Sequence, residues 1–220
     1  MHSLPSFRQG LRCYVTTDNV RKHYKLVIVG GGAGGCSVSA KMSGFISKDE
    51  LLVIEPSDTH YYQPLWTLVG AGINSLKDSM RPTHETLSPG VKWLKSALAK
   101  LIPEENRILT TTGDEITYDY LILSLGLDIR FDMIKGAPEA LLKDPRVCSN
   151  YSKDYVEKTA SAIKAFQSGH ALFTFPSGPI KCAGAPQKIM YLFEDKLSRI
   201  IKNFWPVGVL WFVCMILSNG

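Results

Sequence analysis

The chain has 220 residues, 45% of them hydrophobic, which is enough for one large domain, or one and a half ordinary ones, with a substantial core. The formal net charge is +5, but +3 of it lies within residues 1–24, where four basic residues face one acidic residue. The body therefore carries only about +2, which gives no case for nucleic acid as a partner. Five irregularly spaced cysteines indicate neither a disulfide framework nor a Cys-x-x-Cys metal site, and a reducing or organellar interior fits better.

The first 23 residues have the pattern of a mitochondrial presequence. Leu4, Phe7, Leu11 and Val15 recur at near-helical spacing, with basic residues, serines and threonines between them and no acidic residue before Asp18. The alternative is a disordered basic tail.

A glycine-rich segment follows the apolar run 25–29 and leads into a helix-like stretch. Gly30, Gly32 and Gly35 fit the G-x-G-x-x-G spacing, in which the first glycine turns the chain, the second admits a pyrophosphate and the third packs helix on strand. Glu55 ends a second strand-like run, 51–54, where an acid can accept hydrogen bonds from a ribose. The two features together predict a βαβ dinucleotide site; the alternative is a glycine-rich turn that binds nothing.

Residues 56–66 form a predicted loop that is dense in aromatic side chains. Such a loop either packs or contacts a ligand, and Gln63 is its polar group best suited to face a ligand, because an amide both donates and accepts.

Four strand predictions follow. Residues 91–99 alternate apolar and polar as a half-buried strand does, and 107–110 and 115–118 flank a hairpin turn at 112–114. The apolar run 120–126 ends in Gly126 and predicts a buried parallel strand, with a ligand approaching its carboxyl end.

A second domain is predicted to begin after the helix-like segment 152–168, which Gly169 would end. Its first strand is 171–175, and the loop 176–186 lacks the glycine fingerprint but contains Cys182. A helix over 188–197 follows, with Pro186 near its first turn.

Cys182 is the candidate redox or nucleophilic residue. It precedes a helix N-terminus and follows Lys181, and both the helix dipole and the ammonium group favour a thiolate. The alternative is an inert, packed loop cysteine. Cys36 is predicted to pack in the core, whereas Cys13, Cys148 and Cys214 have no distinguishing context.

Two remaining features carry no catalytic prediction. His60, His84 and His170 are isolated in the sequence and are predicted to be structural or solvent-facing. The apolar tail 204–217 is short for a membrane span of about 20 residues.

Several stretches together resemble a known family, the mitochondrial-type sulfide:quinone oxidoreductases, which are flavoproteins built from two dinucleotide-binding domains. The resemblance lies in residues 29–35, 53–57, 62–72, 173–176 and 181–192. It implies an α/β fold: a Rossmann-like, three-layer FAD-binding domain over 24–148 and the start of a second dinucleotide-type domain over 149–197. Residues 198–220 form a divergent tail.

The resemblance also implies roles for individual residues. Ala33 and Gly34 would lie at the FAD pyrophosphate, Glu55 on the adenosine ribose, Gln63 on the flavin side, and Leu98 would contact adenine through its backbone. The full set of implied cofactor-binding residues is Gly30, Gly32, Ala33, Gly34, Gly35, Glu55, Gln63, Leu98 and Gly126. Cys182 matches one of the two redox cysteines of the family, and no metal site is implied.

In that family, hydrogen sulfide attacks the cysteine pair and leaves a persulfide, two electrons pass through FAD to ubiquinone, and the sulfane sulfur goes to a small acceptor. The implied location is the surface of the inner mitochondrial membrane.

Two alternatives remain at this stage. The first is a non-catalytic fragment that binds FAD or a partner. It remains because the family continues beyond this chain and supplies the second redox cysteine there. A type II NADH dehydrogenase or disulfide reductase is the other, although it predicts a second glycine fingerprint or a Cys-x-x-x-x-Cys pair, and the sequence has neither.

Overall fold

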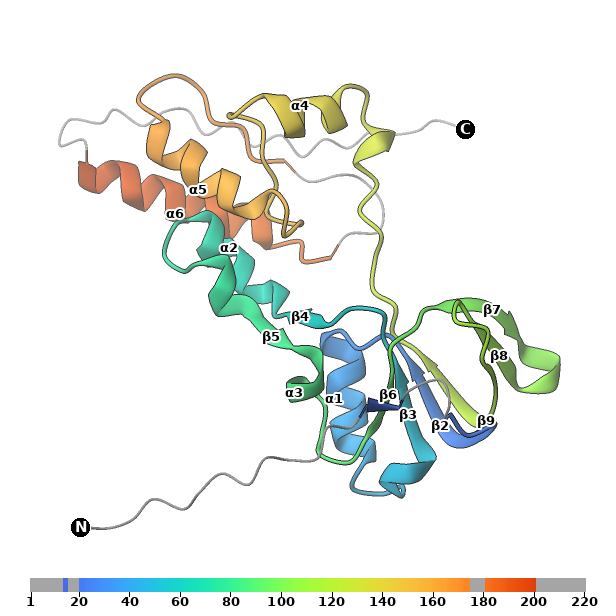
Figure 1. Ribbon diagram of the computed structural model, residues 1–220. Coiled ribbons are helices and arrows are strands. Elements are labelled where there is room, and N and C mark those ends of the chain that lie inside the picture. The colour runs from blue at the N-terminus through green and yellow to red at the C-terminus, as the bar shows by residue number, and fades with distance from the viewer. Residues whose placement is uncertain (1–13, 16–19, 175–180, 201–220) are drawn as a thin grey trace, which may run out of the picture. The chain divides into compact units, whose positions relative to one another are not determined.

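The computed structural model describes residues 14–15, 20–174 and 181–200 (Figure 1). The chain forms two compact units. The first comprises residues up to 61 together with 80–126, and the second comprises 62–79 together with residues from 127 onwards. These boundaries differ from the predicted ranges 24–148 and 149–197, because 62–79 and the segment after 126 pack with the later helices.

A seven-stranded sheet forms the first unit, with strand order β1-β6-β3-β2-β9-β8-β7. Strands β1, β6, β3, β2 and β9 run parallel to one another, whereas β8 is antiparallel to both β9 and β7. The strand bounds are β1 Tyr14–Val15, β2 His23–Val29, β3 Leu51–Ile54, β6 Lys92–Leu94, β7 Leu98–Ile102, β8 Arg107–Thr110 and β9 Glu115–Leu123. The mixed α/β class with a largely parallel, Rossmann-like sheet is as predicted.

Alternating side chains of β2 enter two separate cores, as the two-residue period of a strand requires. Val27 and Val29 join a cluster with Ile108 and Ile116 of the hairpin strands. Leu26 and Ile28 join a second cluster, which packs against Cys36, Val38 and Met42 of helix α1 (Ala33–Met42; Figure 1). The strand is therefore covered on both faces, which explains its nearly continuous apolar sequence.

The aromatic segment 56–66 is not simply a loop, and that prediction is corrected. It contains strand β4 (Thr59–Tyr61), which pairs antiparallel with β5 (Met80–Pro82), and a 3₁₀ turn over Gln63–Leu65. Strand β4 is too short for its alternation to be visible in the sequence. Helix α3 (Thr83–Thr86) follows β5, and a 3₁₀ turn over Lys48–Glu50 precedes β3.

The predicted single strand 91–99 is also corrected, since it divides into β6 and β7. The Ser96 N–H donates to the Leu94 carbonyl (2.9 Å), and this tight turn carries the chain from β6, which lies beside β3, to β7 at the edge beside β8. A two-residue alternation cannot distinguish one strand from two that meet at such a turn.

The hairpin around 112–114 is confirmed. Strand β9 begins after its turn and joins the predicted strand 115–118 to the predicted parallel strand 120–126 in one continuous strand. The prediction that 120–126 is buried is wrong for part of that run. Tyr120 is 65% and Leu125 62% exposed, since among the described strands β8 pairs only with Glu115–Thr117 of β9 and the later part of β9 pairs with β2 alone.

Helices make up the described part of the second unit, with 3₁₀ turns at Leu76–Ser79, Phe131–Met133 and the Gln63–Leu65 turn given above. Their bounds are α2 Trp66–Gly70, α4 Ala137–Lys143, α5 Val156–Ala165 and α6 Ala185–Ile200. Ile163 of α5 and Ile189, Phe193 and Leu197 of α6 form its core together with Ala71.

Helix α5 is shorter than the predicted 152–168. Phe166 leaves the helical conformation, and its ring packs edge-on against Phe193 (5.1 Å between centroids), so the helix ends before Gly169. The predicted strand 171–175 is wrong for 171–174, which have no regular structure; Phe173 instead packs on Phe193 (5.5 Å). The remainder, Phe175, lies outside the described residues.

The two ends of the chain are only partly described. Tyr14 and Val15 of the predicted presequence form β1 at the sheet edge, whereas residues 1–13 and 16–19 lie outside the described part, as does the tail from 201. The presequence therefore stays a prediction. No helix in the described ranges combines the length and apolar character needed to cross a bilayer.

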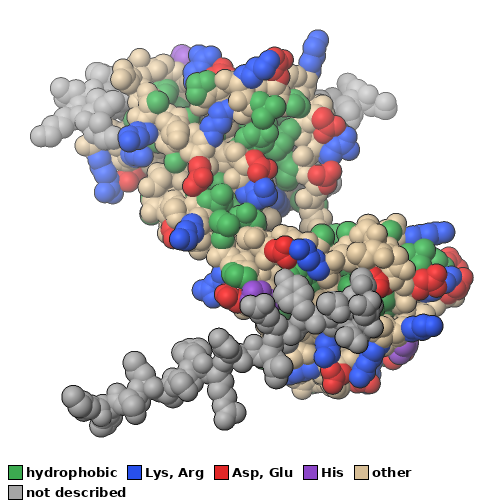
Figure 2. Space-filling view, viewed as in Figure 1, with side chains coloured by type: hydrophobic (Ala, Val, Ile, Leu, Met, Phe, Trp, Pro, Cys, Tyr) green, Lys and Arg blue, Asp and Glu red, His purple; other side chains and the backbone are tan. Residues whose placement is uncertain are grey.

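Acidic and basic side chains are intermixed on the visible face of each unit (Figure 2).

Candidate functional site

The segment 30–35, here called the glycine loop, connects β2 to α1, and two of its glycines are required by close packing. Gly30 has φ +104°, and a Cβ there would lie 2.3 Å from the Ser124 carbonyl oxygen. A Cβ on Gly35 would lie 1.7 Å from the Gly30 carbonyl oxygen. These contacts are far too short for any side chain, so the first and third glycines of the fingerprint hold helix and strands together.

Gly32 differs, because a Cβ at this position meets no atom within 4 Å. Gly32 is the residue before the first turn of α1, and no side chain caps this helix. The first N–H groups of a helix have no acceptor within it, and Gly32, Ala33 and Gly34 are all exposed here. The space and the free donors fit a pyrophosphate group, which is the role predicted for these residues.

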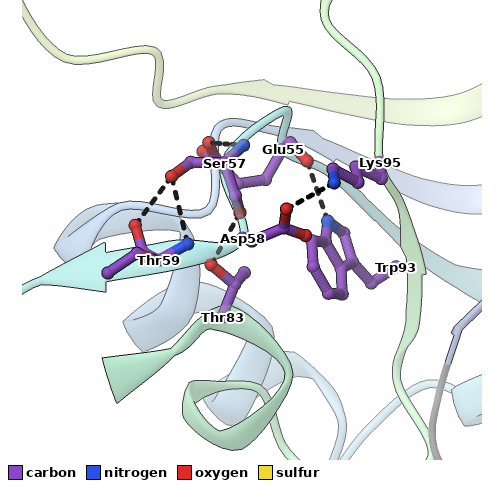
Figure 3. Close-up of polar contacts among 7 residues, drawn as sticks. All are labelled: Glu55, Ser57, Asp58, Thr59, Thr83, Trp93 and Lys95. Carbon is purple, nitrogen blue, oxygen red and sulfur yellow. Dashed lines mark hydrogen bonds and ion pairs between the residues drawn. The ribbon is translucent and has the colours of Figure 1, made fainter. Parts of the chain in front are cut away.

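Glu55 directly follows β3 and contacts the glycine loop. Its Oε2 accepts from the Gly31 N–H (2.7 Å), and its Oε1 accepts from the Ser57 N–H (2.8 Å). A carboxylate oxygen accepts more than one hydrogen bond, so both oxygens keep capacity for hydroxyl donors such as those of a ribose. The Glu55 carbonyl accepts from Trp93 Nε1 (2.8 Å), which anchors the residue to β6 (Figure 3).

The segment 55–59, here called the Glu55 loop, is held by its own polar contacts (Figure 3). The Ser57 hydroxyl donates to the Thr59 carbonyl (2.7 Å), and the Thr83 hydroxyl donates to the Ser57 carbonyl (2.7 Å). Asp58 forms an ion pair with Lys95, which follows β6. The position of Glu55 is thus fixed before any ligand binds.

The carboxyl end of β9 completes this site. The Ser124 hydroxyl lies within hydrogen-bond distance of the carbonyls of Gly30 (3.0 Å) and Val29 (3.1 Å). Gly126 follows with φ +78° and is exposed, with nothing within 4 Å of a Cβ. Leu98 begins β7 in the same unit and is half-buried. The parallel sheet therefore gathers Gly30, Glu55 and Gly126 at the carboxyl ends of β2, β3 and β9.

Cys182 belongs to the second unit, three residues before α6. Its side chain is exposed, and its backbone has φ +91°, which is strained for any residue other than glycine. The Cys182 carbonyl accepts from the Ala185 N–H (2.9 Å) and from the Tyr151 hydroxyl (3.1 Å). Burial, and then the charge of Cys182, raise the pKa of the Tyr151 phenol, so it keeps the proton that it donates at neutral pH.

Lys181 is adjacent to Cys182, but it directs its ammonium group elsewhere. Nζ donates to Gln63 Oε1 (2.8 Å) and lies 5.5 Å from the Trp66 ring centroid. Burial lowers the pKa of Lys181. The predicted ligand-facing amide and the predicted thiolate-favouring ammonium thus contact each other, which the sequence did not indicate across 118 positions.

Cys36, on α1, is half-buried where this helix packs on the sheet, as predicted, and burial raises the pKa of its thiol. His60 is not isolated, because its Nδ1 lies 3.2 Å from the Gly31 carbonyl oxygen. His84 lies 3.9 Å from Glu85. Cys148 is half-buried; Cys13 and Cys214 lie outside the described residues.

Across 14–15, 20–174 and 181–200, no three Cys, His, Asp or Glu side chains gather in a way that could hold a metal ion.

Sequence reasoning missed several contributors to these sites. Gly31, Ser57 and Trp93 contact Glu55, and Tyr151 contacts Cys182. In the sequence, only Gly31 had a signal that it belongs to the site, namely its position inside the glycine fingerprint. A serine or tryptophan has no sequence pattern that links it to Glu55.

The fold and the glycine loop define a class of protein. The profile of the pyridine nucleotide-disulphide oxidoreductase family matches residues 24–163, and the chain belongs to that family.

Known relatives refine this class. The chain is 48% identical over 183 residues to the mitochondrial sulfide:quinone oxidoreductase of Mus musculus. The matched region covers 83% of this chain and 40% of that protein. The chain is 49% identical over 177 residues to the enzyme of the same name from Dictyostelium discoideum, covering 80% and 39% respectively. The resemblance noted in the sequence is confirmed, and the chain spans about 40% of the length of these relatives.

Among solved structures, the sulfide:quinone oxidoreductase of Aquifex aeolicus has a similar fold. The TM-score is 0.65 at 19% identity, over 82% of this chain and 40% of that one.

Proposed function

We propose that this chain contributes the FAD cradle and one redox cysteine of a sulfide:quinone oxidoreductase, an enzyme that oxidises hydrogen sulfide and passes two electrons to ubiquinone. The observation that carries the proposal is the combination of an open glycine loop and an exposed Cys182 in a chain 48% identical to the mouse enzyme of that name.

Membership of the family implies a flavin, and we propose FAD in particular. The adenosine half of FAD requires donors for a pyrophosphate and acceptors for a ribose. Ala33 and Gly34 would supply the donors and Glu55 the acceptors, and the lack of any atom within 4 Å of a Cβ at Gly32 fits this assignment. Gln63, Leu98 and Gly126 remain proposed contacts. A bound flavin would supply an acceptor for two electrons.

Cys182 is proposed to receive the sulfur. An exposed sulfur can be reached by hydrosulfide, and the two hydrogen bonds to the Cys182 carbonyl hold the backbone from which the side chain projects. In the proposed reaction, Cys182 is one half of a disulfide whose second cysteine, by resemblance to the family, lies beyond this chain. Hydrosulfide forms an S–S bond with one sulfur of that disulfide, and the other sulfur leaves as a thiolate. The persulfide then transfers its outer sulfur to a small acceptor, and the reduced cysteine pair gives the two electrons left on it to a bound flavin, which restores the disulfide.

Location and domain roles follow from the same relatives. We propose that the protein lies on the inner mitochondrial membrane, reached through the presequence 1–23, since the curated relatives are named as mitochondrial. Residues 24–148 would act as the FAD domain and 149–197 as the start of the second domain, with 198–220 as the divergent tail.

The test is the reduction of a soluble ubiquinone analogue by sulfide in the wild-type chain and in Cys182→Ser, with FAD and oxidised glutathione supplied. The mixed disulfide between glutathione and Cys182 then takes the place of the cysteine pair. We expect sulfide-dependent reduction in the wild type and its loss in the variant. Equal rates in both would overturn the role of Cys182. Tyr191→Phe is the control, since Tyr191 is 60% exposed on α6 and outside the site.

A second candidate function is supported by the contact of the Lys181 ammonium group with Gln63, since this cation is directed at the amide and not at the Cys182 thiol. The chain would then bind FAD without turning over sulfide, as a non-catalytic module. Bound FAD that sulfide does not reduce would favour this candidate over the first.

A further inference from the structure

Both backbone polar groups of Gly31 have partners. Its N–H donates to Glu55 Oε2 (2.7 Å), while its carbonyl oxygen lies 3.2 Å from His60 Nδ1 and 3.1 Å from Cys36 Sγ. A carbonyl oxygen can only accept, so the nitrogen facing it must carry a proton. This contact favours His60 as a donor at Nδ1. Cys36 Sγ lies 3.9 Å from the same nitrogen and would be a donor to it only in the other tautomer, which would leave two acceptors facing each other at 3.2 Å.

The two donors to the Gly31 carbonyl are unequal. A thiol is a weak donor with a single proton, and Cys36 Sγ also lies 3.4 Å from the Thr86 hydroxyl oxygen, which competes for that proton. The imidazole N–H is the stronger donor, so His60 dominates the orientation of the Gly31 carbonyl.

His60 is itself well placed, because strand β4 holds it. His60 is paired with Arg81 of β5, and the Thr83 N–H donates to the Asp58 carbonyl (2.8 Å) just before β4. Together with the Thr83 contact to Ser57, this ties the start of α3, directly after β5, to the Glu55 loop (Figure 3). One short segment, 55–60, therefore determines both the proposed ribose acceptor and the donor to the glycine loop.

We propose that His60 is a positioning residue for the dinucleotide loop: its Nδ1–H holds the Gly31 peptide in the orientation that leaves the N–H groups of Ala33 and Gly34 directed at a pyrophosphate. The inference rests on the proposed FAD site. A loop ordered before binding loses less conformational freedom when the ligand arrives, and this raises affinity without a new contact to the ligand.

The test compares two substitutions that differ in one donor. In His60→Asn, the side-chain amide nitrogen takes about the place of Nδ1 and can still donate, whereas His60→Leu has a similar size and no donor. FAD affinity is measured for the wild-type and variant chains by quenching of flavin fluorescence. We expect His60→Leu to weaken FAD binding by about 5- to 20-fold, the loss of roughly one hydrogen bond, and His60→Asn to stay within about threefold of the wild type.

Two further readouts separate positioning from a general loss of structure. Thermal unfolding of the FAD-free chains should show His60→Leu and His60→Asn melting within a few degrees of each other. The imidazole nitrogen shifts of the FAD-free wild type should report a proton on Nδ1 of His60, and this reading does not depend on flavin.

Each other outcome overturns the proposal. Equal FAD affinity in wild type and His60→Leu, or equal weakening in His60→Leu and His60→Asn, would show that the donor does not matter. Neutral His60 with its proton on Nε2 would contradict the geometry itself. A folded wild-type chain that binds no FAD, with Nδ1 protonated, would instead refute the proposed function and remove the ligand on which the positioning role depends.

Discussion

Gly32 allows the proposed pyrophosphate site to be tested without disturbing the fold. Its backbone has φ −68° and ψ −169°, which any L-residue can adopt, and a Cβ there meets no protein atom within 4 Å. Gly32→Ala should therefore change the free energy of unfolding by no more than about 1 kcal/mol, as is usual for substitutions that create no clash.

The expected effect on FAD is much larger. A methyl group at this position projects into the space that the pyrophosphate would occupy and would push it away from the first N–H groups of α1. The loss of one hydrogen bond to a charged group weakens binding by about 1.5–3 kcal/mol, which corresponds to about 10- to 100-fold in the dissociation constant.

The assay is a fluorescence titration with FAD, run beside a thermal unfolding curve for each chain. Gly44→Ala is the matched control, because Gly44 lies beyond the end of α1 and the nearest atom to a Cβ there is the Lys41 carbonyl oxygen at 3.5 Å. Unchanged FAD affinity in Gly32→Ala, with stability intact, would refute the reasoning that this glycine leaves room for a ligand.

Three other results are expected. Gly35→Ala should lose stability by at least about 3 kcal/mol in denaturant unfolding, since its Cβ would lie 1.7 Å from the Gly30 carbonyl oxygen; a variant as stable as wild type would contradict that packing. Phe193→Ala should cost about 3–5 kcal/mol in the same measurement, because the ring is 3% exposed in the core of the second unit; a loss below 1 kcal/mol would argue against that core. At pH 8, iodoacetamide should label the exposed Cys182 well before Cys36, whose thiol has a pKa raised by burial; mass spectrometry that found Cys36 labelled first would contradict its burial.

The glycine loop and Glu55 could be predicted from the sequence because their signals are local. A glycine at a tight turn and an acid at the end of an apolar run are both read within a few residues, and β2, β3 and the hairpin fall where the sequence places them.

Contacts between distant segments could not be predicted in this way. His60 lies 29 positions from the carbonyl that it faces, and Lys181 lies 118 positions from Gln63. Nothing in the composition of either neighbourhood encodes such a contact, because it depends on which strands and helices pack together.

The same limit explains the strand errors. The run 171–174 has the apolar residues of a strand, but Phe173 packs on a helix instead of pairing with a neighbour. An apolar run predicts burial, and only the surrounding structure decides whether burial takes place in a sheet or against a helix.

The most direct measurement of the central claim is a titration of the wild-type chain with FAD, ADP and FMN. The proposed site would bind a pyrophosphate and the ribose next to it, both of which belong to the ADP half of FAD. The account predicts that one FAD binds per chain, that ADP competes with it, and that FMN, which lacks this half, binds at least about tenfold more weakly. FMN binding as tightly as FAD, or no binding of FAD by the folded chain, would contradict it.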